Sequence, residues 1–360
     1  MSKPATLLSL MRHLKAYAEF LEARSMDWRH FPVRRDQRVL VHFRGELIDQ
    51  ISRGDLHAST ARSRMSAVIQ FYRYAHTHGF ITSAQPLWAE KTVSVPWSDS
   101  TGFKRSMTRI GTDLSIPNRA RPGQTLEDGL LPLSSHAMME LLRFTGEHQT
   151  SEIHLMLSLG FFTGARLSTI TSLRRESLDS AFPDPLTPGF HLIRIGPGTK
   201  VVTKFDVSGN LLLHDLLLSD LKRYAASTER LLRQAKAKPA DKTLLFLTRR
   251  GNAYSVNSVD RLVQELRKQA LRGGMRFMER FKFHQTRATY GTWLMQFLLG
   301  VTTVSAAVEF VRSAMLHKYE ATTFRYLRFL DNAKRKGEIA QAFSDIFTGL
   351  RVRDWDQIDA

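Results

Sequence analysis

The sequence contains no cysteine. A chain without thiols forms no disulfide and offers no Cys ligand to zinc, which excludes a disulfide-stabilised secreted scaffold and a zinc finger. It also contains no Walker loop, no dinucleotide-binding glycine fingerprint, no His-Glu-x-x-His and no Gly-x-Ser-x-Gly. The familiar signatures of nucleotide binding, metalloproteases and serine hydrolases are therefore missing.

A clear targeting or membrane segment is also lacking. The short apolar run from Leu7 to Met11 is followed at once by Arg12, and no small-residue cleavage site appears, which argues against a signal peptide. The longest apolar stretch, residues 293–311, contains polar residues, so two buried helices joined at Gly300 explain it better than a membrane span. We expect a cytoplasmic protein, associated with the nucleoid if it is bacterial.

Acidic residues are scarce relative to basic ones. Lysine and arginine number 52 against 34 aspartates and glutamates, for a formal net charge of +18 over 360 residues. The positive charge is spread along the chain instead of gathered in one amphipathic segment, which favours nucleic acid over a membrane surface as the partner. The length is sufficient for about two domains.

The first 85 residues show the periodicity of a small all-helical domain. Apolar residues recur at helical spacing over 5–23, 60–78 and, more weakly, 37–53. Ser59 or Thr60 is expected to cap the second of these helices. Three arginines lie off its buried stripe and are candidate DNA-binding residues: Arg62, Arg64 and Arg73.

Residues 86–129 break this pattern with prolines, glycines, serines and threonines, which is typical of a linker. The segment is basic, and Arg105 is one of its candidate DNA contacts. Two interpretations stay open: the linker lies along DNA, or it is a solvated tether.

Residues 130–335 are expected to form a larger, mainly helical domain with one β-hairpin. Residues 190–195 and 204–214 have the character of strands on either side of a turn at Gly196-Pro197-Gly198. Helical patterns follow at 215–235, 256–271, 285–299, 302–315 and 331–349. Residues 336–360 form a C-terminal helix and tail, whose apolar face packs either on its own chain or on a neighbour.

Three short segments contain residue types suited to phosphate chemistry. In the first, Gly164 can interrupt a helix and leave Arg166 at the start of the next. In the second, His284 and Arg287 are three residues apart and so share one side of a helix or helix entry. In the third, a histidine precedes Tyr326 by nine residues, and Thr322 or Thr323 can cap the tyrosine's helix. Taken singly, these residues are more often surface cations and a packed aromatic.

Together the segments closely resemble the tyrosine recombinase, or phage integrase, family. Its signature is an arginine after Thr-Gly, a lysine in a following β-hairpin, a His-x-x-Arg box, and a histidine nine residues before the tyrosine. Residues 59–81 are also similar to the last helix of the family's N-terminal domain. The resemblance implies a mainly α, two-domain DNA clamp: a core-binding domain at 1–85, a basic linker at 86–129, and an integrase-type catalytic domain at 130–335.

The resemblance assigns a role to each matching residue. Arg166 and Arg287 clamp the non-bridging oxygens of the scissile phosphate, a role that suits planar guanidinium donors. Tyr326 is the nucleophile, His284 accepts its proton or orients it, and His317 donates a hydrogen bond to the phosphate.

The general acid is less sharply assigned, since the hairpin offers two lysines. Lys204, at the expected start of the second strand, is preferred, and Lys200 becomes a turn residue that contacts the DNA backbone. The chain departs from the family at Leu316, where glycine is usual, and inside the His-x-x-Arg box, which holds Gln285 and Thr286.

The implied function is a site-specific recombinase or integrase, of a mobile element, that cleaves and rejoins double-stranded DNA through a 3′-phosphotyrosine. It implies no metal, ATP or other cofactor, a tetramer on two DNA sites with the C-terminal helix packed against a neighbour, and accessory proteins as further partners. The alternatives are a type IB topoisomerase, a hairpin-forming resolvase, or a non-catalytic DNA-binding regulator.

Overall fold

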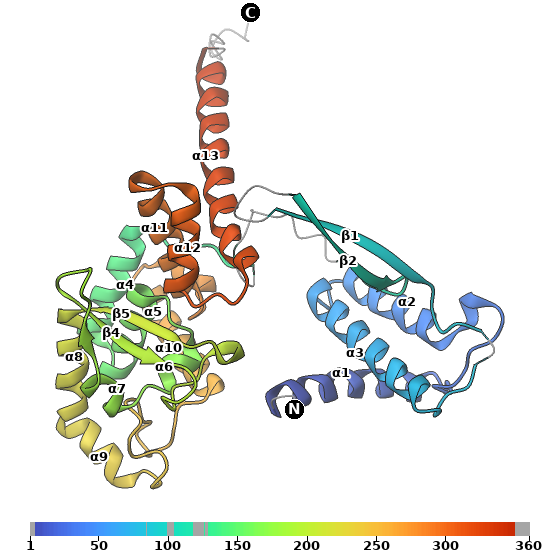
Figure 1. The fold of residues 1–360 in the computed structure, drawn as a ribbon, viewed down its shortest axis with the longest axis horizontal. Helices are drawn as coiled ribbons and strands as arrows, with labels where there is room; N and C mark the ends of the chain where they lie inside the picture. The colour runs from blue at the N-terminus through green and yellow to red at the C-terminus, as the bar shows by residue number, and fades with distance from the viewer. Residues whose placement is uncertain (1–3, 84, 99–103, 118–125, 127–128, 350–360) are drawn as a thin grey trace, which may run out of the picture. The chain divides into compact units, whose positions relative to one another are not determined.

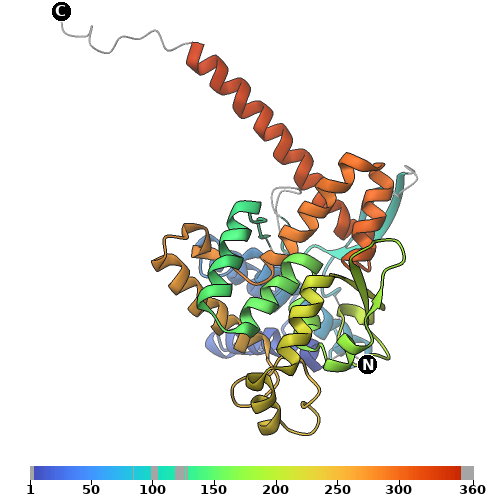
Figure 2. The ribbon, with the colours of Figure 1, turned by 90° about the vertical axis from the view of Figure 1, so that its left-hand side faces the viewer.

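The computed structural model describes residues 4–83, 85–98, 104–117, 126 and 129–349. Its contacts divide the chain into two compact units, Met1–Ala120 and Arg121–Ala360. Figure 1 and Figure 2 show both units as ribbons from two directions. The structure is mainly helical with small antiparallel sheets, as the sequence predicts.

The first unit is built on three helices, α1 (Pro4–Ala23), α2 (Val39–Ser52) and α3 (Ala58–Thr77). A short 3-10 turn at Arg35–Gln37 lies between α1 and α2. The buried stripe of α3 packs against α1, and the hydroxyls of Tyr17 and Tyr72 are 2.5 Å apart in the core. The three predicted helices are therefore confirmed. The predicted cap of α3 is wrong, because the helix already begins at Ala58 and neither Ser59 nor Thr60 precedes it.

The expected linker at 86–129 contains an ordered hairpin. Strand β1 (Glu90–Ser98) pairs antiparallel with β2 (Lys104–Thr112), from Glu90↔Thr112 to Ser98↔Lys104. Leu87 and Leu114, on either side of the hairpin, are buried in the core of the first unit. The irregular interpretation of this segment is corrected. The ladder between the two strands pairs the backbone groups that face each other, so the segment forms a ribbon without the apolar periodicity of a packed element.

The second unit is larger and carries most of the helices. Its helices are α4 (Ser135–His148), α5 (Ser151–Thr163), α6 (Leu167–Thr171), α7 (Arg175–Asp179), α8 (Asp215–Ala226), α9 (Thr228–Lys236), α10 (Val256–Arg272), α11 (Gln285–Val301), α12 (Val304–Ala314) and α13 (Glu320–Gly349), with 3-10 turns at Lys204–Asp206 and Arg276–Arg280. Helix α5 is apolar on all sides and packs against both α4 and α11 at the centre of the unit.

A three-stranded antiparallel sheet lies beside these helices in the order β3 (Phe182–Pro183), β4 (Phe190–Ile195), β5 (Gly209–His214). The bounds of β4 match the prediction. The second strand begins at Gly209 and not at 204, because Lys204–Asp206 turn instead, with Phe205 and Asp206 at φ values of 64° and 54°. Lys204 is therefore a loop residue between the strands, which corrects its expected position at the start of a strand.

The long apolar stretch forms two helices, as predicted. Helix α11 ends at Val301 and α12 begins at Val304 after Thr303, whose hydroxyl accepts a hydrogen bond from the Ala306 N–H. The stretch is not fully buried, however, since Trp293 is 54% exposed. Along the part of the chain that the structure describes, no helix combines the length and apolarity needed to cross a membrane.

Helix α13 is continuous over 30 residues. It begins at Glu320, so Thr322 and Thr323 lie inside its first turn and the predicted caps are wrong. Tyr326 and the predicted helix at 331–349 are therefore parts of the same helix. Its C-terminal half extends away from the rest of its unit (Figures 1 and 2).

Candidate active site

Arg287 links three segments that are far apart in the sequence. It lies in the first turn of α11 and is 2% exposed. One guanidinium nitrogen donates to the carbonyl oxygen of Gly164, and the other donates to the carbonyl oxygen of Met315 at 2.7 Å. The turn before Arg166 and the segment before His317 are thereby held against α11.

The Thr-Gly turn has the predicted geometry. Gly164 ends α5 at a φ of 62°, in the left-handed region, and Arg166 occupies the position just before α6. A Cβ atom on Gly164 would come within 2.4 Å of the Tyr290 ring, so both the backbone conformation and the space require glycine. Arg166 is half-buried.

His317 and Tyr326 form a buried pair. His317 is 5% exposed, and its Nδ1 lies 2.8 Å from the hydroxyl of Thr323. Its ring stacks on that of Tyr326 with centroids 5.9 Å apart. Tyr326 is 0% exposed, and a Cβ atom on Gly291 would come within 2.5 Å of its ring. Since Gly291 is one turn beyond Arg287 on α11, the structure brings Arg287, His317 and Tyr326 into one cluster.

Lys204 is exposed, and its turn contacts the segment that leads to Tyr326. Its Nζ lies 5.3 Å from the ring centroid of Phe205, and the Nζ of Lys318 lies 5.4 Å from the same ring. The Phe205 ring in turn packs edge-on to Tyr319 at 6.2 Å. Lys200 is an exposed turn residue with a φ of 60°.

Leu316, where the family usually has glycine, adopts a φ of 51°. This left-handed conformation favours glycine, which explains the family preference in physical terms. The leucine side chain packs on the start of β5. A Cβ atom on Gly209, the first residue of that strand, would come within 2.2 Å of it.

His284 is half-buried at the N-terminal end of α11, about one turn before Arg287.

Burial raises the pKa of Tyr290, on the same helix, to about 12, although the charge of Arg287 acts in the opposite direction. A tyrosine with such a pKa stays protonated near neutral pH.

The predicted DNA-binding residues fall in both units. Arg62 and Arg73 are exposed on α3 and Arg64 is half-buried; the guanidinium of Arg73 lies 5.7 Å from the centroid of the Trp88 ring. Arg105 falls on β2, and its side chain lies outside the described residues.

Sequence reasoning missed three supports of the cluster: Gly291, Thr323 as a partner of His317, and the carbonyl groups that receive Arg287. A glycine one turn after an arginine inside an apolar helix is a signal that could have found the first. The carbonyl contacts carry no side-chain signature, so only the fold reveals them.

No protein-family model and no curated protein matches this sequence. Solved structures do match in fold. The Tn1549 transposon integrase in complex with a circular intermediate DNA aligns at a TM-score of 0.58 and 13% identity, over 90% of each chain. The same integrase with transposon right end DNA gives 0.56 and 13%, over 94% of each chain. A lambda integrase dimer bound to a COC′ core site gives 0.52 and 14%, over 90% of this chain and 89% of that one.

These neighbours are integrases, and the match covers 90% of the chain and so reaches both of its units. The integrase-type fold that the sequence motifs imply is therefore confirmed.

Proposed function

We propose that the chain is a site-specific DNA recombinase or integrase of a mobile element, with Tyr326 as its nucleophile. The observation that supports this most strongly is the buried cluster of Arg287, His317 and Tyr326, tied by Arg287 to the turn that leads into Arg166. The order and spacing of these residues match the family signature, and the neighbours in fold are complexes with DNA.

In the proposed reaction Arg166 and Arg287 hold the non-bridging oxygens of the scissile phosphate and offset the charge of the pentavalent transition state. The Tyr326 oxygen bonds to phosphorus as its proton passes to His284. The 5′-oxygen of the DNA leaves and takes a proton. The 5′-hydroxyl of another strand then attacks the 3′-phosphotyrosine, which releases the tyrosine and reseals the DNA.

Lys204 is the proposed donor of that proton. Its turn contacts the segment between His317 and Tyr326 through Phe205 and Tyr319, which supports a position near the reaction. Lys200 remains the alternative donor, and otherwise contacts the DNA backbone.

The burial of Tyr326 adds a requirement. A side chain that is 0% exposed cannot attack a phosphate from solvent, so the segment around it must open before cleavage. We attribute this opening to DNA binding, so the protein would be inactive until it binds DNA.

The proposed substrate is double-stranded DNA, held between a core-binding domain at 1–85 and a catalytic domain at 130–335. Backbone contacts are assigned to Arg62, Arg64, Arg73, Arg105 and Lys200. A location in the cytoplasm, on the nucleoid in a bacterium, follows from this substrate.

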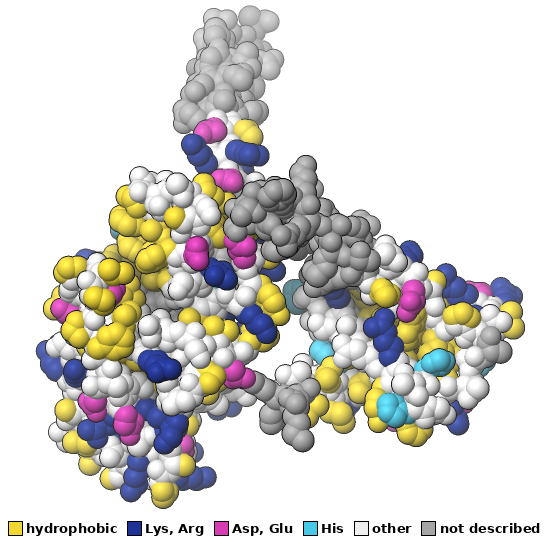
Figure 3. Space-filling view, viewed as in Figure 1, with side chains coloured by type: hydrophobic (Ala, Val, Ile, Leu, Met, Phe, Trp, Pro, Cys, Tyr) yellow, Lys and Arg dark blue, Asp and Glu magenta, His cyan; other side chains and the backbone are white. Residues whose placement is uncertain are grey.

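A tetramer on two DNA sites is the proposed active assembly, in which α13 of one copy packs against the next. Two features support this: the C-terminal half of α13 extends away from its own unit, and Ile339 on it is 68% exposed. An apolar groove of about 390 Å³ between α4, α5 and α11, lined by Met139, Phe162 and Trp293, is a suitable acceptor. Figure 3 shows hydrophobic side chains gathered over this part of the unit.

Product analysis separates this proposal from its alternatives. The substrate is DNA from the ends that flank the gene in its host, supplied as two labelled duplexes. Strands joined between the duplexes support recombination. Relaxation of a supercoiled plasmid that carries the same ends, without joined strands, indicates a type IB topoisomerase. Closed hairpin ends indicate a resolvase, and binding without any cleavage indicates a regulator.

A further inference from the structure

Thr323 lies in the first turn of α13 with its side chain against His317. The threonine is 0% exposed, and its Oγ1 lies 2.8 Å from the Nδ1 of His317, which is itself 5% exposed. Both groups are shielded from water, so each depends on the other for its hydrogen bond. The direction of this bond determines which nitrogen of the histidine carries a proton.

The contacts of the Thr323 hydroxyl indicate that direction. A hydroxyl offers one proton and can accept two hydrogen bonds. In the described part of the chain, Nδ1 of His317 is the only hydrogen-bond partner of this hydroxyl. If the Nδ1–H group donated to it, the proton of the hydroxyl would be buried without an acceptor, which costs free energy. The favoured arrangement is therefore donation from Thr323 to Nδ1.

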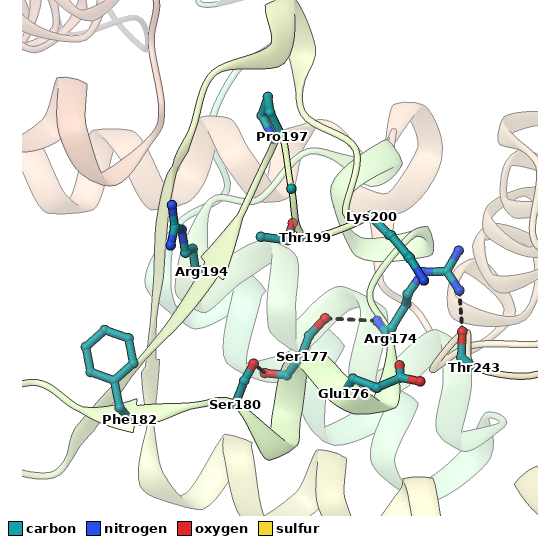
Figure 4. Close-up of a pocket in the computed structure, with 11 residues that line it drawn as sticks. Arg174, Glu176, Ser177, Ser180, Phe182, Arg194, Pro197, Thr199, Lys200 and Thr243 are labelled. Atoms are coloured by element: carbon teal, nitrogen blue, oxygen red, sulfur yellow. Dashed lines mark hydrogen bonds between the residues drawn. The ribbon is translucent and has the colours of Figure 1, made fainter.

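Other hydroxyl groups of the second unit place their protons differently. A serine or threonine in a helix commonly donates to a carbonyl oxygen three or four residues earlier. Three residues do so here: Ser180 to Ser177, beside the pocket drawn in Figure 4, Thr163 to Leu159, and Thr292 to Ala288. Over the residues that the structure describes, Thr323 makes no such bond, so its proton is available to the histidine.

A second threonine–histidine pair in the same unit is the opposite case. The Thr145 hydroxyl lies 2.9 Å from the Nδ1 of His154, but it also donates to the carbonyl oxygen of Leu142 at 3.1 Å. Because its proton is already placed, Thr145 accepts from His154, and Nδ1 of that histidine carries a proton. The two pairs join the same kinds of atoms and predict opposite tautomers.

The tautomer decides what His317 can do at the other side of its ring. A neutral imidazole carries one ring proton. When Nδ1 accepts from Thr323, that proton is on Nε2, which becomes a hydrogen-bond donor without a positive charge on the ring. In the opposite tautomer Nε2 would be an acceptor and could not pair with a phosphate oxygen. The proposed reaction requires a donor here.

We propose that Thr323 is a positioning residue whose hydroxyl holds His317 in the tautomer with its proton on Nε2, so that a neutral histidine donates to the scissile phosphate. The tautomer follows from contacts within the chain, and its use in cleavage rests on the proposed function. Because the two residues are six positions apart in the segment that leads to Tyr326, their bond can persist when that segment opens.

Nitrogen-15 NMR of the unbound protein, labelled in its histidine rings, tests the tautomer directly. At about pH 8, above the ordinary histidine pKa of about 6.5, we expect His317 to carry its proton on Nε2 and His154 to carry its proton on Nδ1. Loss of the signals in His317→Gln and His154→Gln assigns them. A proton on Nδ1 of His317 in the wild-type protein, or the same tautomer at both histidines, would overturn the proposal.

Two substitutions at Thr323 separate the hydroxyl from the shape of the side chain. Thr323→Val removes the hydroxyl, and we expect the proton of His317 to spread over both ring nitrogens. Thr323→Ser keeps the hydroxyl and should keep the proton on Nε2. Thr322→Val changes the adjacent half-buried threonine and is the matched control, with the wild-type tautomer. A single Nε2 tautomer in Thr323→Val, or equal changes in the valine and serine variants, would overturn the proposal.

Single-turnover formation of the covalent adduct measures the use of this tautomer. Loss of one fixed donor to the phosphate should slow Thr323→Val about tenfold or more, whereas Thr323→Ser and Thr322→Val should stay within about threefold of wild type. A wild-type rate in Thr323→Val beside a mixed tautomer would refute the positioning role and leave the recombinase standing. The expected tautomers without an adduct in any of these proteins would refute the recombinase and leave the tautomer standing.

Discussion

At the scale of single residues, two glycines of α11 allow the packing of Tyr326 to be tested. A methyl group on Gly291 would lie 2.5 Å from the Tyr326 ring and 2.6 Å from the Met315 sulfur, whereas Gly300 has nothing within 4 Å. We expect Gly291→Ala to displace Tyr326 and slow formation of the covalent adduct at least tenfold, with DNA binding retained.

Gly300→Ala is the matched control, because it should raise helix stability by about 0.5–1 kcal/mol and leave cleavage unchanged. Single-turnover cleavage and anisotropy measure both effects. Equal cleavage rates in the two variants would show that Tyr326 does not depend on its contact with α11.

Arg287 has a structural role besides its proposed chemical one. Replacement by glutamine would leave the buried carbonyl groups of Gly164 and Met315 without their donor, and each such loss costs about 1–3 kcal/mol. We therefore expect Arg287→Gln to lower the free energy of unfolding by about 2–6 kcal/mol in urea titrations. Arg280→Gln, at an exposed position, should stay within about 0.5 kcal/mol of wild type. Wild-type stability in Arg287→Gln would contradict the linking role.

At the scale of secondary structure, the extended half of α13 makes the proposed assembly testable. Removing residues 336–360 should leave the binding of one protein copy to DNA intact and abolish the larger complexes. Analytical ultracentrifugation of protein with duplex DNA measures the change. Undiminished tetramers in the truncated protein would show that α13 does not join the copies.

Most elements could be predicted from sequence because their apolar periodicity survives in the fold. Strand β4 and helices α1, α3, α10 and α11 follow this rule. The hairpin at 90–112 could not, since neither face of a two-stranded ribbon needs a core and Pro96 obscures the strand pattern. The turn at Lys204–Asp206 was missed because a left-handed φ is unusual for a bulky residue such as Phe205.

The candidate site, too, could be predicted from sequence only in part. Spacing along the chain was sufficient to single out Arg166, Arg287 and Tyr326. It could not show that Tyr326 is buried, or that Thr323 binds His317 instead of capping a helix. Those facts depend on which segments meet in space.

At the scale of the whole molecule, buried tyrosines make stability sensitive to alkaline pH. Burial raises the pKa of Tyr17 and Tyr72 in the first unit and of Tyr224 and Tyr290 in the second, that of Tyr290 to about 12. An unfolded tyrosine has a pKa of about 10. The free energy of unfolding therefore does not change through these groups below about pH 10, and it falls as the pH rises towards 12.

Urea midpoints measured at about pH 9 and pH 11 should show this loss. Tyr290→Phe removes one ionising group, so its midpoint should fall less than that of wild type over the same interval. Identical falls in both proteins would mean that Tyr290 does not contribute.

In the proposed reaction Tyr326 forms a covalent bond to DNA, and this bond can be trapped. A nicked duplex built from the mapped element ends lets the cleaved fragment diffuse away, so the protein cannot reseal the strand. We expect a protein–DNA adduct that survives denaturing electrophoresis, maps to Tyr326, and is abolished by Tyr326→Phe while DNA binding persists. An adduct that persists in Tyr326→Phe, or none in the wild-type protein on DNA that it binds specifically, would contradict the proposed reaction.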